Sequence, residues 1–203
     1  MGALSIEHLN ETLRLADCEP LDQYTKCTFT DTDLPVHLSD ITFKRCTFPE
    51  NQSHNDFVSV TFQHCDLANT DFKMAKFGSC QFTDCRLLGA DFTQTTLIAT
   101  TFKNCPAQMI NFSEAYFQKC QFQTCDFTDA LFLNVTTRLR TKVQFDDCQL
   151  QRVDLLDTKL KGWDVSRSTL GEWHLSAQDI GGLVIAPWQA ANLISLFGVQ
   201  VKA

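Results

Sequence analysis

The sequence lacks the features that mark an enzyme, a membrane protein or a secreted protein. Its 203 residues hold no apolar run of membrane-spanning length, and no basic segment followed by an apolar core begins the chain. The eight glycines form no phosphate loop, no serine sits in a nucleophile elbow, and the five histidines have no metal-ligand spacing. We therefore expect a soluble, cytoplasmic protein that is not an enzyme, with no catalytic residues, metal, cofactor or small-molecule substrate.

Phenylalanine is abundant, with 17 in the chain, and it recurs at an unusual period. Between Phe57 and Phe132 an apolar residue, here called a centre, appears every five positions. A helix repeats at 3.6 residues and a strand at two, so a period of five requires one turn of the chain per repeat. Two positions before each centre lies a mostly small residue, which period-two geometry places on the same inward face.

The pattern also indicates the number of sides in each coil. Every second centre from Phe62 to Phe132 is Phe, while those between are mixed, so like residues repeat at ten or twenty rather than fifteen. Four sides of five residues fit this spacing and three do not. Repeats that bury their apolar faces only against their neighbours stack into a solenoid. Coils of about 20 residues, spaced by ~4.8 Å, predict a rod of about eight coils.

The repeats resemble the pentapeptide-repeat family, whose unit is a small residue, Asp or Asn, Leu or Phe, and two outward residues. Ala90-Asp91-Phe92-Thr93-Gln94 follows that unit, as do Cys65-Asp66-Leu67 and Cys125-Asp126-Phe127. The resemblance implies an all-β fold, a right-handed four-sided (quadrilateral) β-helix. It says little about function, because one fold serves many roles.

The ten cysteines are predicted to be reduced and structural. Nine of them occupy the small inward position of a repeat: Cys27, Cys46, Cys65, Cys80, Cys85, Cys105, Cys120, Cys125 and Cys148. A free cysteine behaves there as a small buried hydrophobe, so packing explains these residues without disulfides or metal.

The net charge of −7 favours a partner with a basic groove and argues against direct binding of nucleic acid. Part of this charge has a structural explanation, because nine aspartates directly precede a centre, where a carboxylate can accept hydrogen bonds from turn backbone. They are Asp33, Asp56, Asp66, Asp71, Asp91, Asp126, Asp154, Asp164 and Asp179.

We predict a single domain over residues 1–203. Residues 1–21 form an N-terminal cap, in which Ile6, Leu9 and Leu13 have helical spacing after Ser5. Coils fill residues 22–185, interrupted by a polar loop at 49–56 and a basic loop at 133–142. Residues 186–203 form a helix from Pro187 to Gly198 and then a strand over 199–201. This ending either caps the solenoid or pairs with a second copy.

Within the family, the chain resembles the topoisomerase-protecting branch: the quinolone-resistance Qnr proteins, their mycobacterial relative, and the immunity proteins against microcin B17 and albicidin. The resemblance rests on the helix-strand ending, the polar loop, and Asn134-Val135-Thr136-Thr137-Arg138 in the basic loop. It implies a homodimeric DNA mimic that binds DNA gyrase or topoisomerase IV and protects it from quinolones or a toxin, an antibiotic-resistance role. The alternative is a scaffold rod that binds another protein. In neither case do we expect contact with a membrane.

The resemblance assigns partner contacts to the two loops, at Glu50, Asn51, Gln52, Ser53, His54, Asn134, Thr136, Thr137, Arg138, Arg140 and Lys142. It assigns the dimer interface to Trp188, Leu193, Ile194, Leu196, Phe197, Val199 and Val201. Solenoids also accept insertions on one face, so both loops have an alternative interpretation as tolerated insertions.

Overall fold

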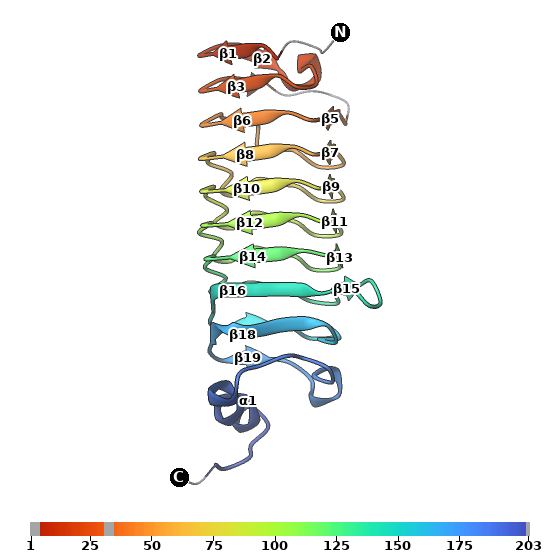
Figure 1. The fold of residues 1–203 in the computed structure, drawn as a ribbon, viewed down its shortest axis with the longest axis vertical. Helices are drawn as coiled ribbons and strands as arrows, with labels where there is room; N and C mark the ends of the chain where they lie inside the picture. The colour runs from red at the N-terminus through yellow and green to blue at the C-terminus, as the bar shows by residue number, and fades with distance from the viewer. Residues whose placement is uncertain (1–4, 31–34, 202–203) are drawn as a thin grey trace.

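The computed structural model describes residues 5–30 and 35–201, which form a straight rod of stacked coils (Figure 1). A nine-stranded parallel sheet runs along one side: β1 (Glu7–Leu9), β3 (Gln23–Thr25), β6 (Thr42–Lys44), β8 (Thr61–Gln63), β10 (Gln81–Thr83), β12 (Thr101–Lys103), β14 (Gln121–Gln123), β16 (Val143–Leu150) and β18 (Trp163–Leu170). A six-stranded parallel sheet lies on another: β5 (His37–Ser39), β7 (Asp56–Val58), β9 (Lys76–Gly78), β11 (Thr96–Ile98), β13 (Tyr116–Gln118) and β15 (Thr136–Thr137).

Short elements complete the two ends of the rod. Strands β2 (Thr12–Arg14) and β4 (Thr28–Thr30) pair near the N-terminus, and β17 (Val153–Asp154) pairs with β19 (Trp173–His174) near the C-terminus. The chain also forms the 3₁₀ turns η1 (Leu15–Asp17), η2 (Ala177–Asp179) and η3 (Pro187–Gln189), and the helix α1 (Ala190–Ser195). No helix in residues 5–30 or 35–201 is long and apolar enough to cross a membrane.

The strand register confirms the predicted length of a coil. Phe62 pairs with Phe82, Phe82 with Phe102, and Phe102 with Phe122. Each of these pairs stacks its rings in parallel, with centroids 4.7 to 5.2 Å apart. The protein is therefore a β-solenoid of about eight turns, in which each regular coil has four sides of one repeat each.

Each corner of the coil has a left-handed backbone conformation. From Ser59 to Asp129 every fifth residue has a φ between +52° and +65°, and Gly89 is the only glycine at these positions. This conformation costs a non-glycine residue about 1 kcal/mol or more. Corner N–H groups donate to the next coil, as Ser59 does to the Gly78 carbonyl at 2.7 Å. Stacking between coils therefore offsets the strain, and the corners depend on their neighbours.

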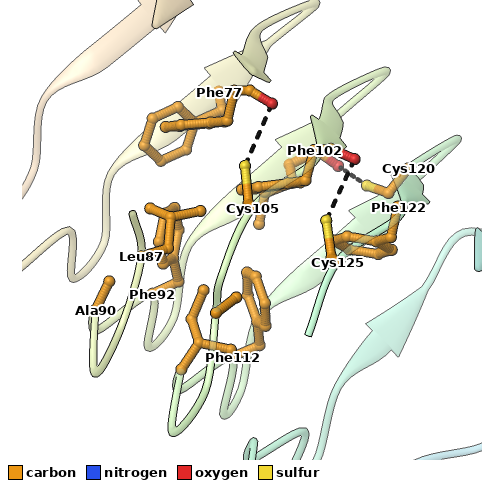
Figure 2. Close-up of a cluster of buried hydrophobic side chains, with 14 of the residues drawn as sticks. Phe77, Leu87, Ala90, Phe92, Phe102, Cys105, Phe112, Cys120, Phe122 and Cys125 are labelled. Carbon is orange, nitrogen blue, oxygen red and sulfur yellow. Dashed lines mark hydrogen bonds between the residues drawn. The ribbon is translucent and has the colours of Figure 1, made fainter. Parts of the chain in front are cut away.

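The cysteines lie where the sequence predicted and bind the backbone of the preceding coil. All nine at inward positions are buried, and Cys18 is half-buried. Their thiols donate to the carbonyl oxygens of centres one coil earlier, at 3.3 to 3.6 Å for Cys85–Phe62, Cys105–Phe82 and Cys125–Phe102. Figure 2 shows the last of these bonds, from Cys125 to Phe102. The small inward residue thus contributes a hydrogen bond as well as a fit to the core.

The segment 5–14 forms strands rather than the helix that the spacing of Ile6, Leu9 and Leu13 predicted. β1 pairs with β3 and β2 pairs with β4, both in the first coils of the rod. Pairing satisfies the exposed edge of the first regular coil, which a helix cannot do. Ile6 and Leu9 are consequently more than half exposed.

Residues 49–56 continue the coil, so the prediction of a loop projecting from the rod is wrong. Asn51 forms a parallel β-bridge with Asp71 of the next coil, and the N–H of Gln52 donates to the Asp71 carbonyl at 2.7 Å. Gln52 occupies the centre position that phenylalanine fills elsewhere, and it is 3% exposed. This centre was not predicted because it is polar, and Leu38, a buried centre of β5, was not predicted either.

The C-terminal end matches the predicted helix but not the predicted strand. η3 and α1 follow Pro187, and α1 lies against the last coil (Figure 1). Gln189 fixes this end, because its buried amide nitrogen donates to the carbonyls of Val165 at 2.9 Å and Ser168 at 2.7 Å. Residues 199–201 form no strand in the described single chain, since no neighbouring strand pairs with them.

Candidate functional site

One side of the rod is acidic. It comprises the coil sides centred on Gln52, Phe72, Phe92, Phe112, Phe132 and Leu155. Six carboxylates and one lysine lie there, a net charge of −5 before histidines: Glu50, Asp71, Asp91, Glu114, Asp154 and Asp157, with Lys73. We call this side the acidic face.

The aspartates of the acidic face are held by their own turns. One carboxylate oxygen of Asp71 accepts a hydrogen bond from the N–H two residues later, at 2.9 Å. Asp91 and Asp154 do the same at 2.9 and 3.2 Å. The turn fixes the position of each carboxylate, so each aspartate presents a negative charge at a defined place on the surface.

The same turn bond confirms the predicted structural role for six aspartates of the chain: Asp66, Asp71, Asp91, Asp126, Asp154 and Asp164. Asp56 instead lies in β7 and Asp179 in η2, while Asp33 lies outside the described residues. Asn51 and Asn111 make the identical bond at 2.9 Å, so the turn needs the oxygen and not the charge.

Asp91 is the most constrained of these carboxylates. Burial raises the pKa of Asp91. Hydrogen bonds from the hydroxyl and N–H of Thr93, together with the ammonium of Lys73, lower it by more, so the pKa lies below its usual value. Lys73 lies 3.2 Å from Asp91 and 3.9 Å from Asp71. The Asp91 carboxylate therefore keeps its charge at neutral pH.

The residues predicted for the first loop divide between core and surface. Gln52 lies in the core, where its amide nitrogen donates to the Asn51 carbonyl at 3.0 Å and its oxygen accepts from Asn55 at 3.1 Å. Gln52 therefore cannot contact a partner. Glu50, Asn51 and His54 are exposed and Ser53 is partly exposed, so these four lie on the acidic face.

Only part of the second predicted loop leaves the rod. β15 still pairs with β13, and Val135 is buried in the core. Residues 139–142 form the projecting turn that Figure 1 shows beyond β15. Phe102 pairs with Phe122, but Phe122 pairs with Phe145, so the coil that carries the turn is longer than a regular one. The exposed residues among the predicted contacts of this loop are Asn134, Thr136, Arg138, Arg140 and Lys142.

The last coils replace phenylalanine stacking with tryptophan. Thr137 takes a centre position but has no ring, and its hydroxyl oxygen accepts a hydrogen bond from the indole N–H of Trp163 at 3.2 Å. The Trp163 ring stacks with Phe145 at 5.3 Å and with Phe117 at 6.1 Å. Trp163 thus fills the column beside Thr137 and keeps the coil closed at the projecting turn.

The predicted interface residues also divide into two groups. Leu193 is buried and Leu196 packs against the core, so these two hold α1 to the rod. Five others expose more than a third of their surface to solvent: Trp188, Ile194, Phe197, Val199 and Val201. The exposed group forms an apolar end, whose largest member, Trp188, is 61% exposed.

The described residues contain no group of three His, Cys, Asp or Glu side chains placed to hold a metal ion.

Residues 55–132 match the family model of the pentapeptide repeat region. The match covers 78 of the 203 residues, the most regular part of the rod. No curated protein sequence matches the chain.

Two solved structures resemble this chain along most of their lengths. One is HetL from the cyanobacterium Nostoc sp. strain PCC 7120, which is involved in heterocyst differentiation regulation; the TM-score is 0.54 and the identity 12%, over 90% of this chain and 84% of HetL. The other is a trypsin-treated variant of QnrB1, a plasmid-mediated fluoroquinolone resistance protein, with a TM-score of 0.54 and 18% identity over 98% of each chain. At these identities the likeness shows the fold.

Proposed function

We propose that this protein is a pentapeptide-repeat DNA mimic that binds a type II topoisomerase, DNA gyrase or topoisomerase IV, and protects it from quinolones or a topoisomerase-poisoning toxin. The observation that carries the proposal is the acidic face. Asp71 and Asp91 lie in one column on consecutive coils, spaced by about 4.8 Å, and a DNA strand carries a phosphate every ~3.4 Å of helix axis. A groove that binds duplex DNA meets fixed carboxylates at a comparable spacing on these two coils of the rod.

The likeness to QnrB1 supports this choice of partner. QnrB1 is a fluoroquinolone resistance protein, and the matched structure covers 98% of this chain. The projecting turn at residues 139–142 is a departure from an otherwise regular coil, and it carries exposed cationic side chains. We propose that this turn contacts the topoisomerase and promotes release of the drug.

We further propose that the protein is a homodimer joined at its C-terminal end. Trp188, Ile194 and Phe197 expose apolar surface on and beside α1, and residues 199–201 have backbone free to pair with a second copy. A two-fold contact between identical ends buries this surface without leaving an open edge. Two rods joined end to end also double the length of the acidic face.

The test is a supercoiling and DNA-cleavage assay with purified gyrase, with and without a fluoroquinolone. The wild-type protein is expected to restore supercoiling and reduce cleavage in the presence of the drug. Deletion of residues 139–141 gives Phe122 and Phe145 the same sequence separation as Phe102 and Phe122, so the coil regains its regular length. This variant should still bind gyrase but fail to rescue it from the drug. The single variant Arg140→Gln controls for charge, because Arg140 is the one charged residue that the deletion removes. Full rescue by the deletion variant identifies the turn as a tolerated insertion.

The second candidate function is a scaffold that binds another protein through its flat sides. The likeness to HetL, with the same TM-score as QnrB1, favours it. The nine-stranded side also carries mostly neutral side chains from β8 to β14, such as Thr61, Gln81, Thr101 and Gln121. If the wild-type protein binds neither gyrase nor topoisomerase IV, the scaffold function replaces the topoisomerase proposal.

A further inference from the structure

A groove of about 860 Å³ lies beside the projecting turn, on the coil side that follows the acidic face. Arg138, which directly precedes the projecting turn, and Arg140, within it, line one side of the groove, and Lys159 and Lys161 line it from the next coil. Asp157 is the one carboxylate in the lining. Four cations and one anion give this basic groove a net charge of +3, whereas the whole chain carries −7.

The cations of the basic groove differ from several other arginines of the rod in having no carboxylate partner. Arg86, Arg152 and Arg167 each form an ion pair with an aspartate of a neighbouring coil, at 2.6 to 3.2 Å. Among the described residues, none of the four groove cations forms such a pair. Arg138 instead donates to the side-chain oxygen of Gln118 at 3.0 Å, which positions its guanidinium without neutralising it.

The turn also holds an apolar side chain in solvent. Leu139 is 83% exposed, the most exposed of the large apolar residues described, and it stands between two arginines. The Thr141 hydroxyl donates to the Arg138 carbonyl at 2.8 Å and the Thr141 N–H donates to the same oxygen at 3.3 Å. The turn is therefore closed by its own hydrogen bonds, and it presents Leu139 at a fixed place.

Glycine keeps the backbone close at the base of the groove. Gly162 has a φ of +90°, and a Cβ there would lie 2.8 Å from the Thr141 carbonyl oxygen. A side chain at this position would therefore push against the projecting turn that carries Arg140. The close approach of the two backbones fixes the turn against the next coil and gives the groove a defined floor.

We propose that the basic groove binds an acidic, partly apolar segment of a partner protein. Arginine forks pair with carboxylates, and Leu139 supplies a contact that an apolar side chain of the segment can cover. A nucleic acid offers the same negative charge, but the neighbouring acidic face repels an extended polyanion and Leu139 gains little from phosphates. The basic groove shares the projecting turn with the topoisomerase proposal, but the inference does not rest on that proposal, because it concerns recognition of an acidic segment and is tested without a topoisomerase.

The test measures fluorescence anisotropy of a labelled peptide with three copies of Glu-Glu-Leu-Gly, titrated with the full-length protein. A second peptide with Ser in place of Leu tests the apolar contact, and a labelled single-stranded oligonucleotide of equal charge tests nucleic acid. Binding of the leucine peptide is expected to weaken about tenfold for Arg138→Glu. It should weaken several-fold for Leu139→Ser. The matched control Lys103→Glu, on the nine-stranded side, reverses one positive charge in the same way and should bind like wild type.

Three outcomes overturn the proposal. Equal losses for Arg138→Glu and Lys103→Glu show that the peptide senses only the overall charge. Tighter binding of the oligonucleotide than of either peptide, lost in Arg138→Glu, assigns the groove to nucleic acid. Absence of peptide binding at low salt shows that the groove does not bind acidic segments. Circular dichroism of each variant confirms that the solenoid is intact.

Discussion

The hydroxyl of Thr100 donates a hydrogen bond of 3.0 Å to the carbonyl oxygen of Phe77 on the preceding coil. Cys80 and Cys120, one coil before and one coil after Thr100, donate their thiols to Phe57 and Leu97 at 3.3 and 3.4 Å. Threonine and cysteine are thus interchangeable in this column because both are small and both donate. Each such bond joins one coil to the one before it.

Replacement of Thr100 tests this relationship. Thr100→Val keeps the shape but removes the donor, and it should lower the free energy of unfolding by about 1 kcal/mol. Thr100→Cys restores a donor and should lower it by less than half as much. Chemical denaturation of the three proteins measures the difference. Equal destabilisation by Val and Cys would show that the position selects for size alone.

The buried cysteines should be unreactive in the folded protein. Burial raises the pKa of Cys46, Cys80 and Cys120 to about 12, so almost no reactive thiolate is present near pH 8. A thiol reagent is expected to label native protein slowly and to label nearly all ten cysteines after unfolding. A reductant should leave the circular dichroism spectrum unchanged. Rapid labelling of native protein, or loss of structure on reduction, would contradict the structural role of the thiols.

The first coil should loosen as pH rises. Burial lowers the pKa of His8, but hydrogen bonds with Asp22 and Glu11 and their negative charges raise it above its usual value of 6.5. His8 also stacks on Tyr24, with ring centroids 4.6 Å apart. A raised pKa in the folded state means that protonated His8 stabilises the coil below the unfolded pKa, and that this stability is lost as pH rises through the folded value.

Hydrogen exchange of the β1 and β3 amides measures this loosening. After correction for intrinsic rates, protection should be greater at about pH 5 than at about pH 8. His8→Phe keeps a ring on Tyr24 and removes the titrating group, so its protection should not change between the two conditions. The same pH dependence in His8→Phe would assign the effect to another group of the first coil.

Substitutions at the C-terminal end should distinguish residues that stabilise the fold from residues that join two copies. Trp188→Ser combined with Phe197→Ser removes exposed apolar side chains and should convert a dimer to a monomer without lowering the unfolding temperature. Leu193→Ser removes a buried contact of α1 and should destabilise the end of the rod by about 2 kcal/mol or more. Light scattering after size exclusion reports the mass. A monomeric wild-type protein would reject the dimer proposal.

The regular coils were predictable because each centre is apolar and each small residue precedes it by two positions. Prediction failed where one of these properties was missing. Gln52 is polar at a centre and is satisfied by Asn55, a pairing that exists only after the chain has folded. The first coil was mistaken for a helix because Ile6, Leu9 and Leu13 fit a helical spacing, while pairing between β1 and β3 depends on residues of the next coil.

The candidate surfaces were predictable only in part. The basic residues of the second loop were recognised, but Lys159 and Lys161 join them only because one coil stacks on the next. The acidic face could not be read from the net charge, since it requires knowing which residues of successive coils lie in one column. Gln189 was missed because its role is to bind carbonyls of the preceding coil, for which a lone glutamine gives no signal.

The charge of the acidic face is tested most directly by measuring gyrase binding of two matched triple variants. The acidic-face variant changes Asp71, Asp91 and Asp154 to Asn, and the control variant changes Asp66, Asp126 and Asp164 to Asn. All six aspartates accept the turn hydrogen bond. Asn51 and Asn111 show that an asparagine can accept the same bond. Both variants lose three charges and should keep the wild-type unfolding temperature. Binding to immobilised gyrase is measured at low salt. The affinity is expected to fall about tenfold or more for the acidic-face variant and less than about threefold for the control. Equal affinities for the two variants, or no binding by the wild-type protein, would contradict DNA mimicry by this face.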